Sequence, residues 1–139
     1  WICVELPRLE VFYSPDGIAN VGIIATGALV RNAMLAAKDL EKKGIRCKIL
    51  NLHTIKPIDS EAIIKLAKET KHIVTVEEHQ KHGGMGSAVA EVLAQEFPVP
   101  VEFVGVDKFG QSGEPNELIE HYKMGREAIK DAVTRVINR

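Results

Sequence analysis

Short runs of apolar, mostly β-branched residues alternate with longer amphipathic segments along most of the chain. Runs of this kind predict strands that are buried on both faces, and the segments between them carry the spacing of amphipathic helices. The predicted strands are residues 21–26, 45–52, 73–76 and 101–106. The predicted helices are residues 29–43, 59–70 and 87–97, followed by a short helix around Leu118 and Ile119 and a closing helix over residues 126–137.

Cap and breaker residues define the ends of these elements. Gly44 stops the first helix, and Asp59 or Ser60 can cap the second. Ser87 follows a run of glycines and can cap the third helix. The prolines after residue 97 stop this helix. The strand that begins at residue 73 is expected to stop at Glu77, where charged residues begin.

Strands that alternate with helices predict a parallel sheet covered on both faces, that is, a three-layer α/β/α sandwich. Residues 1–20 form a lead-in in which residues 9–13 can add a short edge strand, and residues 21–139 form the single domain. In such a sheet, ligands and partners meet the loops at the carboxyl ends of the strands. Those loops are expected at residues 27–28, 53–59, 77–86 and 107–116.

The loop after the strand at residue 73 is the strongest candidate for a functional surface. It combines acidic residues, two histidines and a glycine turn directly before a helix, whose first amides can face an anion or a carbonyl group of a partner. The glycines serve equally well as simple turn formers. The candidate interdomain or anion-binding residues are Glu78, His79, His82, Gly83, Gly84, Gly86 and Ser87.

Several other chemistries are not favoured by these residues. The first predicted turn has one glycine, Gly27, instead of the glycine triplet of a dinucleotide site, and there is no P-loop pattern. His79 and His82 lack a third ligand nearby in the sequence, so no metal site is expected. No nucleophile in a recognisable turn accompanies the histidines and glutamates, and the basic group of Lys123 and Arg126 is expected to be solvated surface.

Composition narrows the class of protein. The chain has 139 residues, 45% of them apolar, and a net charge of −1, so it can bury a core and shows no bulk electrostatic attraction to nucleic acid or membrane. No apolar run approaches the roughly 20 residues that span a bilayer, and no signal peptide is evident, so a cytoplasmic location is expected. Cys3 and Cys47 lie far apart in the sequence and are expected to be buried thiols.

A series of motifs in one order resembles the C-terminal domain of transketolase and its relatives among the thiamine-diphosphate enzymes. The resemblance covers about residues 21–137, nearly the whole chain. The motifs are Ile24-Ala-Thr-Gly27, the helix from Ala33 to Gly44, Leu50-Asn-Leu-His-Thr-Ile-Lys-Pro-Ile-Asp59, Val74-Thr-Val-Glu-Glu-His79, Gly83-Gly-Met-Gly86 and Phe109-Gly-Gln-Ser-Gly-Glu-Pro-Asn-Glu-Leu118.

The resemblance implies a mixed, mostly parallel sheet of five strands, with the first strand antiparallel to the others. It also implies a parent enzyme, a dimer that transfers a two-carbon ketol unit between sugar phosphates. In that family an amino-terminal domain holds thiamine diphosphate and Mg²⁺, and a middle domain supplies the activating glutamate. No catalytic or cofactor-binding residue therefore carries over to this chain. The domain alone is expected to be inactive and to serve assembly with the other domains or with a companion subunit.

Other assignments remain open at this point. Deoxyxylulose-phosphate synthase and the β subunit of 2-oxo-acid dehydrogenases have C-terminal domains with the same fold. The sequence of the domains upstream would tell which of these enzymes the chain belongs to. A free-standing regulatory or nucleotide-binding module belongs to a different class. Tight binding of a nucleotide to the chain would favour that module, and binding to a thiamine-diphosphate partner would oppose it.

Overall fold

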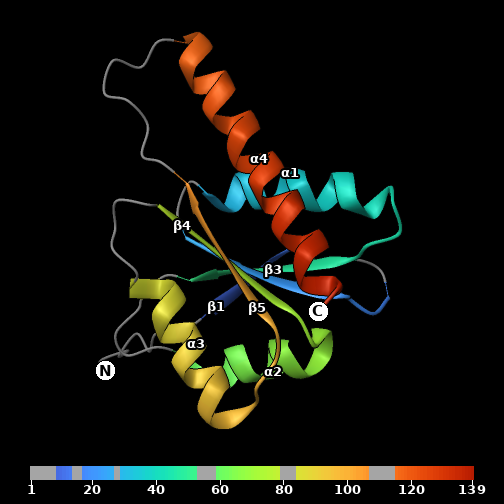
Figure 1. Cartoon of the computed structure of the whole chain (residues 1–139), viewed down its shortest axis with the longest axis vertical. Coiled ribbons are helices and arrows are strands. Elements are labelled where there is room, and N and C mark those ends of the chain that lie inside the picture. The colour runs from blue at the N-terminus through green and yellow to red at the C-terminus, as the bar shows by residue number, and fades with distance from the viewer. Residues whose placement is uncertain (1–8, 14–16, 27–28, 53–58, 79–83, 107–114) are drawn as a thin grey trace, which may run out of the picture.

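The computed structural model describes residues 9–13, 17–26, 29–52, 59–78, 84–106 and 115–139; of residues 9–13, 52, 78, 106 and 115–124 it describes the backbone. Five strands form one sheet in the order β1-β3-β2-β4-β5 (Figure 1). Their bounds are β1 Leu9–Tyr13, β2 Val21–Ala25, β3 Cys47–Leu52, β4 Ile73–Glu78 and β5 Val101–Val106. Strand β1 pairs antiparallel with β3, and the remaining pairs are parallel. The mixed five-stranded sheet is thus confirmed.

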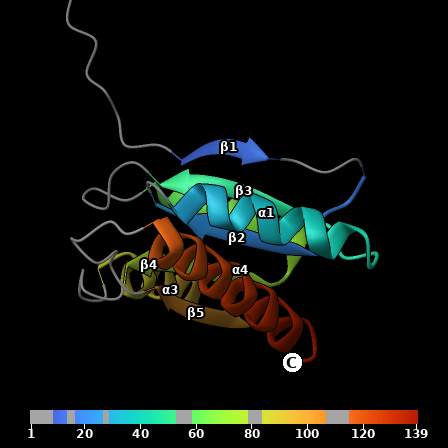
Figure 2. The same cartoon turned by 90° about the horizontal axis from the view of Figure 1, so that it is seen from above.

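Four helices cover the two faces of this sheet. Helices α1 (Leu29–Glu41) and α4 (Pro115–Ile137) pack together on one face, and α2 (Ser60–Thr70) and α3 (Gly84–Glu96) pack together on the other (Figures 1 and 2). The described helices and strands therefore form the three-layer α/β/α sandwich that the alternating pattern predicts.

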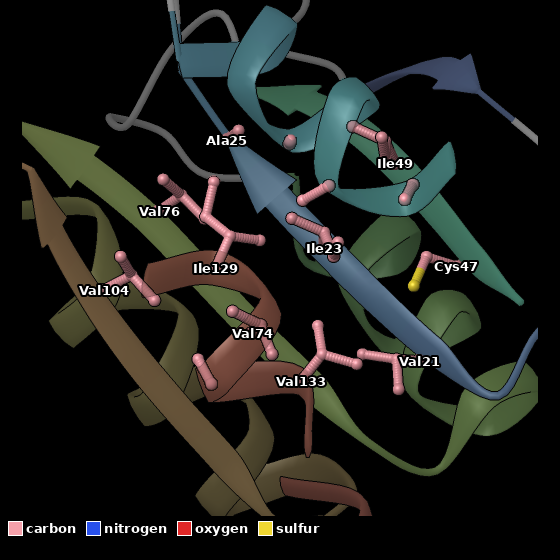
Figure 3. Close-up of a cluster of buried hydrophobic side chains, with 14 of the residues drawn as sticks. Val21, Ile23, Ala25, Cys47, Ile49, Val74, Val76, Val104, Ile129 and Val133 are labelled. Atoms are coloured by element: carbon pink, nitrogen blue, oxygen red, sulfur yellow. The ribbon is translucent and has the colours of Figure 1, made fainter. Parts of the chain in front are cut away.

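Each face of the sheet has its own apolar cluster. On the α1 and α4 side, side chains such as Val21, Ile23 and Val74 from the strands meet Ile129 and Val133 of α4 (Figure 3). On the other side, Ile24 and Ile73 meet Leu66 of α2 and Leu93 of α3. The strands read as continuous apolar runs because both of their faces are buried.

The ends of the first two helices follow the cap signals closely. Helix α1 ends at Glu41, and the turn after it closes at Gly44, whose φ of +84° suits glycine. Asp59, one of the two predicted caps, accepts a hydrogen bond from the Ala62 N–H at 3.1 Å at the start of α2. The thiol of Cys47 is buried, as predicted.

Three expectations about elements are wrong. Strand β4 continues through Glu77 to Glu78, because β5 pairs with it up to that residue. Helix α3 begins at Gly84, so Ser87 lies within its first turn and does not cap it. The two helices predicted near the carboxyl terminus are one helix, α4, since no proline separates them and Gly125 is a tolerated, buried position within it. Among the described residues, no helix has both the length and the apolar character that a membrane crossing requires.

Candidate functional site

The structure places part of the predicted loop at the carboxyl end of β4. Glu78 is the last residue of that strand, and Gly84, Gly86 and Ser87 lie in the first turn of α3. Gly86 is buried, whereas Gly84 and Ser87 are exposed. The remaining candidates, His79, His82 and Gly83, lie outside the described residues.

A carboxylate from β4 caps the first turn of α3. The Glu77 Oε2 atom accepts hydrogen bonds from the N–H of Met85, at 3.1 Å, and from the N–H of Gly86, at 3.3 Å. These amides belong to the group that a helix leaves without internal partners, and a negative charge is favourable at this end of a helix. Glu77 therefore joins the end of the strand to the start of the helix and fixes both ends of the loop between them.

This contact bears on the anion-binding half of the sequence prediction. Two amides that could have faced an external anion are satisfied by a carboxylate of the same chain. What the loop binds stays a prediction. The sequence shows Glu77 beside Glu78, but no local pattern tells which of them turns back to the helix, because the contact spans eight residues or more.

Gly86 permits close packing between α3 and the strands. A Cβ atom at this position would lie 2.9 Å from Cδ1 of Phe103 on β5, 3.3 Å from the Thr75 hydroxyl and 3.4 Å from the Glu77 Oε1 atom. The Thr75 hydroxyl is buried, and none of the residues that the structure describes forms a hydrogen bond with it. The absence of a side chain at Gly86 thus lets α3 pack against β4 and β5 at the rim.

Of the histidines outside the loop, His72 is the one whose side chain the structure describes, and it lies away from the loop. The imidazole of His72 lies at the start of β4, with Nδ1 3.2 Å from the carbonyl oxygens of Asn20 and Thr70. It is therefore at the opposite end of the sheet from Glu78. His53 lies outside the described residues, and His121 is described by its backbone alone.

Arg126 is not merely solvated surface, which corrects the sequence prediction. Its Nε and Nη2 atoms each donate to the carboxylate of Asp39 on α1 at 2.5 Å, and Lys130 lies 3.4 Å from the same carboxylate. The hydrogen bond from Arg126, together with that from Lys130, lowers the pKa of Asp39 from 3.8 to about 2. This contact fastens α4 to α1, and the two helices also pack against each other.

The described residues do not provide a site for a metal diphosphate. Among them, no group of three or more His, Cys, Asp and Glu side chains could hold a metal ion. At the start of α3, the amides that face the rim already bind the Glu77 carboxylate.

Comparison with known proteins assigns the fold to a family. Residues 18–129 match the family described as "Transketolase, C-terminal domain". The chain is 42% identical over 121 residues to the 6-deoxy-6-sulfo-D-fructose transketolase subunit of a Clostridium strain, covering 86% of this chain and 38% of that protein. It is 44% identical over 115 residues to a subunit of the apulose-4-phosphate transketolase of Phocaeicola vulgatus, covering 82% of this chain and 36% of that protein.

A solved structure agrees with these matches. It is described as "Split gene transketolase, inactive beta4 tetramer", and it superposes with a TM-score of 0.79 at 39% identity, covering 94% of this chain and 42% of that chain. The chain thus spans well under half the length of these relatives. The motif order, the five-stranded sheet and the family match agree, and the chain belongs to the transketolase C-terminal domain family.

Proposed function

We propose that this chain is the C-terminal domain of a thiamine-diphosphate-dependent transketolase, at the end of one polypeptide or of a separate subunit. The match of residues 18–129 to the transketolase C-terminal domain carries this proposal. The parent enzyme transfers a two-carbon ketol unit from a ketose phosphate to an aldose phosphate. Two relatives that are named as transketolase subunits support the split arrangement.

In this proposal the domain is not catalytic by itself. The chain corresponds to 38% of one relative, so most of an enzyme of that length lies outside it. Thiamine diphosphate and Mg²⁺ are held by the other domains, and when bound the cofactor supplies the carbanion chemistry. This chain contributes the loop at the carboxyl end of β4 and the capped helix α3, against which the other domains pack.

The loop from Glu78 to Ser87 is the proposed contact with the middle domain. Its position at the carboxyl end of a central strand and the Glu77 cap that fixes its ends support this role. The domain extends from residue 21 to residue 139, with residues 1–20 as a lead-in. The parent is a dimer and works in the cytoplasm.

A second parent is favoured by a specific likeness. The chain is 37% identical over 136 residues, 95% of its length, to the 1-deoxy-D-xylulose-5-phosphate synthase of Desulfitobacterium hafniense, of which it covers 21%. A synthase of this kind would form 1-deoxy-D-xylulose 5-phosphate, whereas a transketolase exchanges ketol units between sugar phosphates. The substrates of the intact enzyme therefore separate the two parents.

The test is to capture the native protein from its source with an antibody against this chain. The masses of the captured polypeptides and any retained thiamine diphosphate are then measured, and ketol transfer between sugar phosphates is compared with formation of 1-deoxy-D-xylulose 5-phosphate. We expect a longer polypeptide or a tight companion subunit, with the cofactor retained and ketol transfer active. A lone chain of this size with neither companion nor cofactor would refute the proposal.

A further inference from the structure

Strand β5 is an edge of the sheet, and its outer side is open over half its length. Among the described strands, it pairs with β4 alone. The Ile73 N–H of β4 donates to the Pro100 carbonyl at 3.1 Å, so the backbone groups of even-numbered residues at this strand point toward β4. Successive residues alternate in direction, and odd-numbered residues therefore point their N–H and C=O groups outward.

The amino-terminal half of this edge is closed by the end of α4. The outward carbonyl of Val101 accepts a hydrogen bond from Arg139 Nη1 at 3.1 Å. Arg139 and Arg135 also pair with the Glu102 carboxylate, each at 3.2 Å. Charged side chains that cover an edge are a common protection against pairing with another strand.

The second half, residues 103–105, has no such protection. In the described part of the chain, no group bonds to the outward N–H and C=O of Phe103 and Gly105. The Phe103 side chain is 56% exposed, and Gly105 is exposed as well. This half carries no charge and no proline, so it is a template for an added strand.

We propose that this open half pairs with the same segment of a second copy of the chain, antiparallel about a twofold axis at Val104. Phe103 then lies opposite Gly105 of the second copy, and the two residues exchange both of their backbone hydrogen bonds. Directly opposite side chains share a face, so Phe103, whose ring packs beside Gly86 of its own chain, meets a glycine of the second copy that takes up no room on that face. This aromatic–glycine match is self-complementary.

The neighbouring register fits less well. Placing Phe103 opposite Phe103 of the second copy would set Gly105 against Val101, whose carbonyl is already bound by Arg139. The register centred on Val104 uses both open residues, and it places none of the described β5 residues of the second copy opposite Val101. The paired segments are also uncharged, so no charge loses its solvation, while Glu102 and its arginine partners stay outside. The inference concerns the chain's own edge strand and does not depend on which enzyme the domain serves.

The test is analytical ultracentrifugation of the full 139-residue chain over a concentration series. Because the contact is small, we expect a weak dimer whose population grows up to about 1 mM protein. Phe103→Lys should weaken the dimer about tenfold or more. Ile18→Lys is the matched control, since Ile18 is the other exposed large apolar side chain among the described residues, at 77%, and it precedes the central strand β2 and not the β5 edge.

Residue-resolved amide exchange provides a second readout of the register. The amides of Phe103 and Gly105 should gain protection as the dimer forms, whereas those of Glu102 and Val104, which face β4, should not change. A chain that stays monomeric throughout would overturn the proposal. An association that Phe103→Lys leaves unchanged, or that protects other amides instead, would overturn it as well.

Discussion

Glu77 holds the start of α3 through one carboxylate oxygen, so its replacement tests the cap directly. Glu77→Ala leaves the N–H groups of Met85 and Gly86 without their partner. We expect it to lower the free energy of unfolding by about 1–2 kcal/mol. Glu77→Gln keeps an acceptor oxygen and loses the charge that favours a helix N-terminus, so we expect a smaller loss of about 0.5 kcal/mol.

Urea denaturation followed by circular dichroism measures both changes. Glu91→Ala is the control, because Glu91 is an exposed residue in the middle of the same helix. Its unfolding free energy should stay within about 0.5 kcal/mol of the unsubstituted chain. Equal effects of the alanine variants at positions 77 and 91 would contradict the role of Glu77 as a cap.

Gly22 leaves no room for a side chain at the centre of the sheet. A Cβ atom there would lie 2.5 Å from Cγ of Leu66, which is 1% exposed. We expect Gly22→Ala to destabilise the fold by about 1–3 kcal/mol through overpacking. Leu66→Ala should cost about 2–5 kcal/mol by leaving a cavity.

The double variant tests whether the two residues share one space. The alanine methyl group at position 22 would partly fill the cavity at position 66, so the combined loss should be smaller than the sum of the single losses. Unfolding free energies of the four proteins give the coupling. If the loss of the double variant equals the sum of the two single losses to within about 0.5 kcal/mol, the contact with Leu66 does not limit the space at position 22.

The contact of Asp39 on α1 with Arg126 and Lys130 on α4 makes a pH-dependent contribution to stability. Because the folded-state pKa of Asp39 lies below its ordinary value, the ionised carboxylate stabilises the fold at pH values above 3.8. That contribution is lost as the pH falls from 3.8 toward about 2. We therefore expect Asp39→Asn to unfold more easily than the unsubstituted chain at about pH 6, with the difference shrinking at pH values near 2.

Unfolding free energies at a series of pH values measure this difference. Asp131→Asn is the matched control, because Asp131 is an exposed aspartate on α4. Its difference from the unsubstituted chain should stay small and nearly constant with pH. If the difference in unfolding free energy between Asp39→Asn and the unsubstituted chain widens toward low pH, the lowered pKa of Asp39 is contradicted.

Most elements of this fold can be predicted from local signals. Strand β5 has its predicted bounds because prolines precede it and its apolar run is nearly unbroken. Helix α4 is less predictable, because its first half lacks a long apolar stripe and Gly125 suggests a break. That half becomes helix as the continuation of a segment whose later residues Ile129 and Val133 pack in the core.

The candidate site is less predictable than the fold. The sequence locates the loop after β4 through its glycines, but it misplaces the helix start at Ser87. A serine is a strong local cap signal, and here a carboxylate from the preceding strand replaces it. Likewise, the partner of Arg126 is Asp39, which lies 87 residues earlier, so local pattern cannot reveal the pair. Contacts between distant segments are what the sequence alone leaves undetermined.

At the scale of the whole molecule, most of the proposed enzyme lies in other domains, so its activity depends on assembly with them. The chain spans 38% of one relative and 42% of the similar solved chain. We expect the purified chain, given thiamine diphosphate and Mg²⁺, to show no ketol transfer. Addition of a polypeptide that carries the cofactor-binding and middle domains should give turnover.

The same reconstitution tests the loop as the docking surface. His79→Ala and Gly84→Val should each weaken binding of the companion polypeptide about tenfold, because both change the surface that the loop presents. Lys65→Ala on α2 is the control, since Lys65 is exposed on another helix, and it should bind normally. Titration calorimetry gives the affinities. Unchanged binding by both loop variants, with turnover still restored, would remove the loop as the contact while leaving the transferase assignment standing.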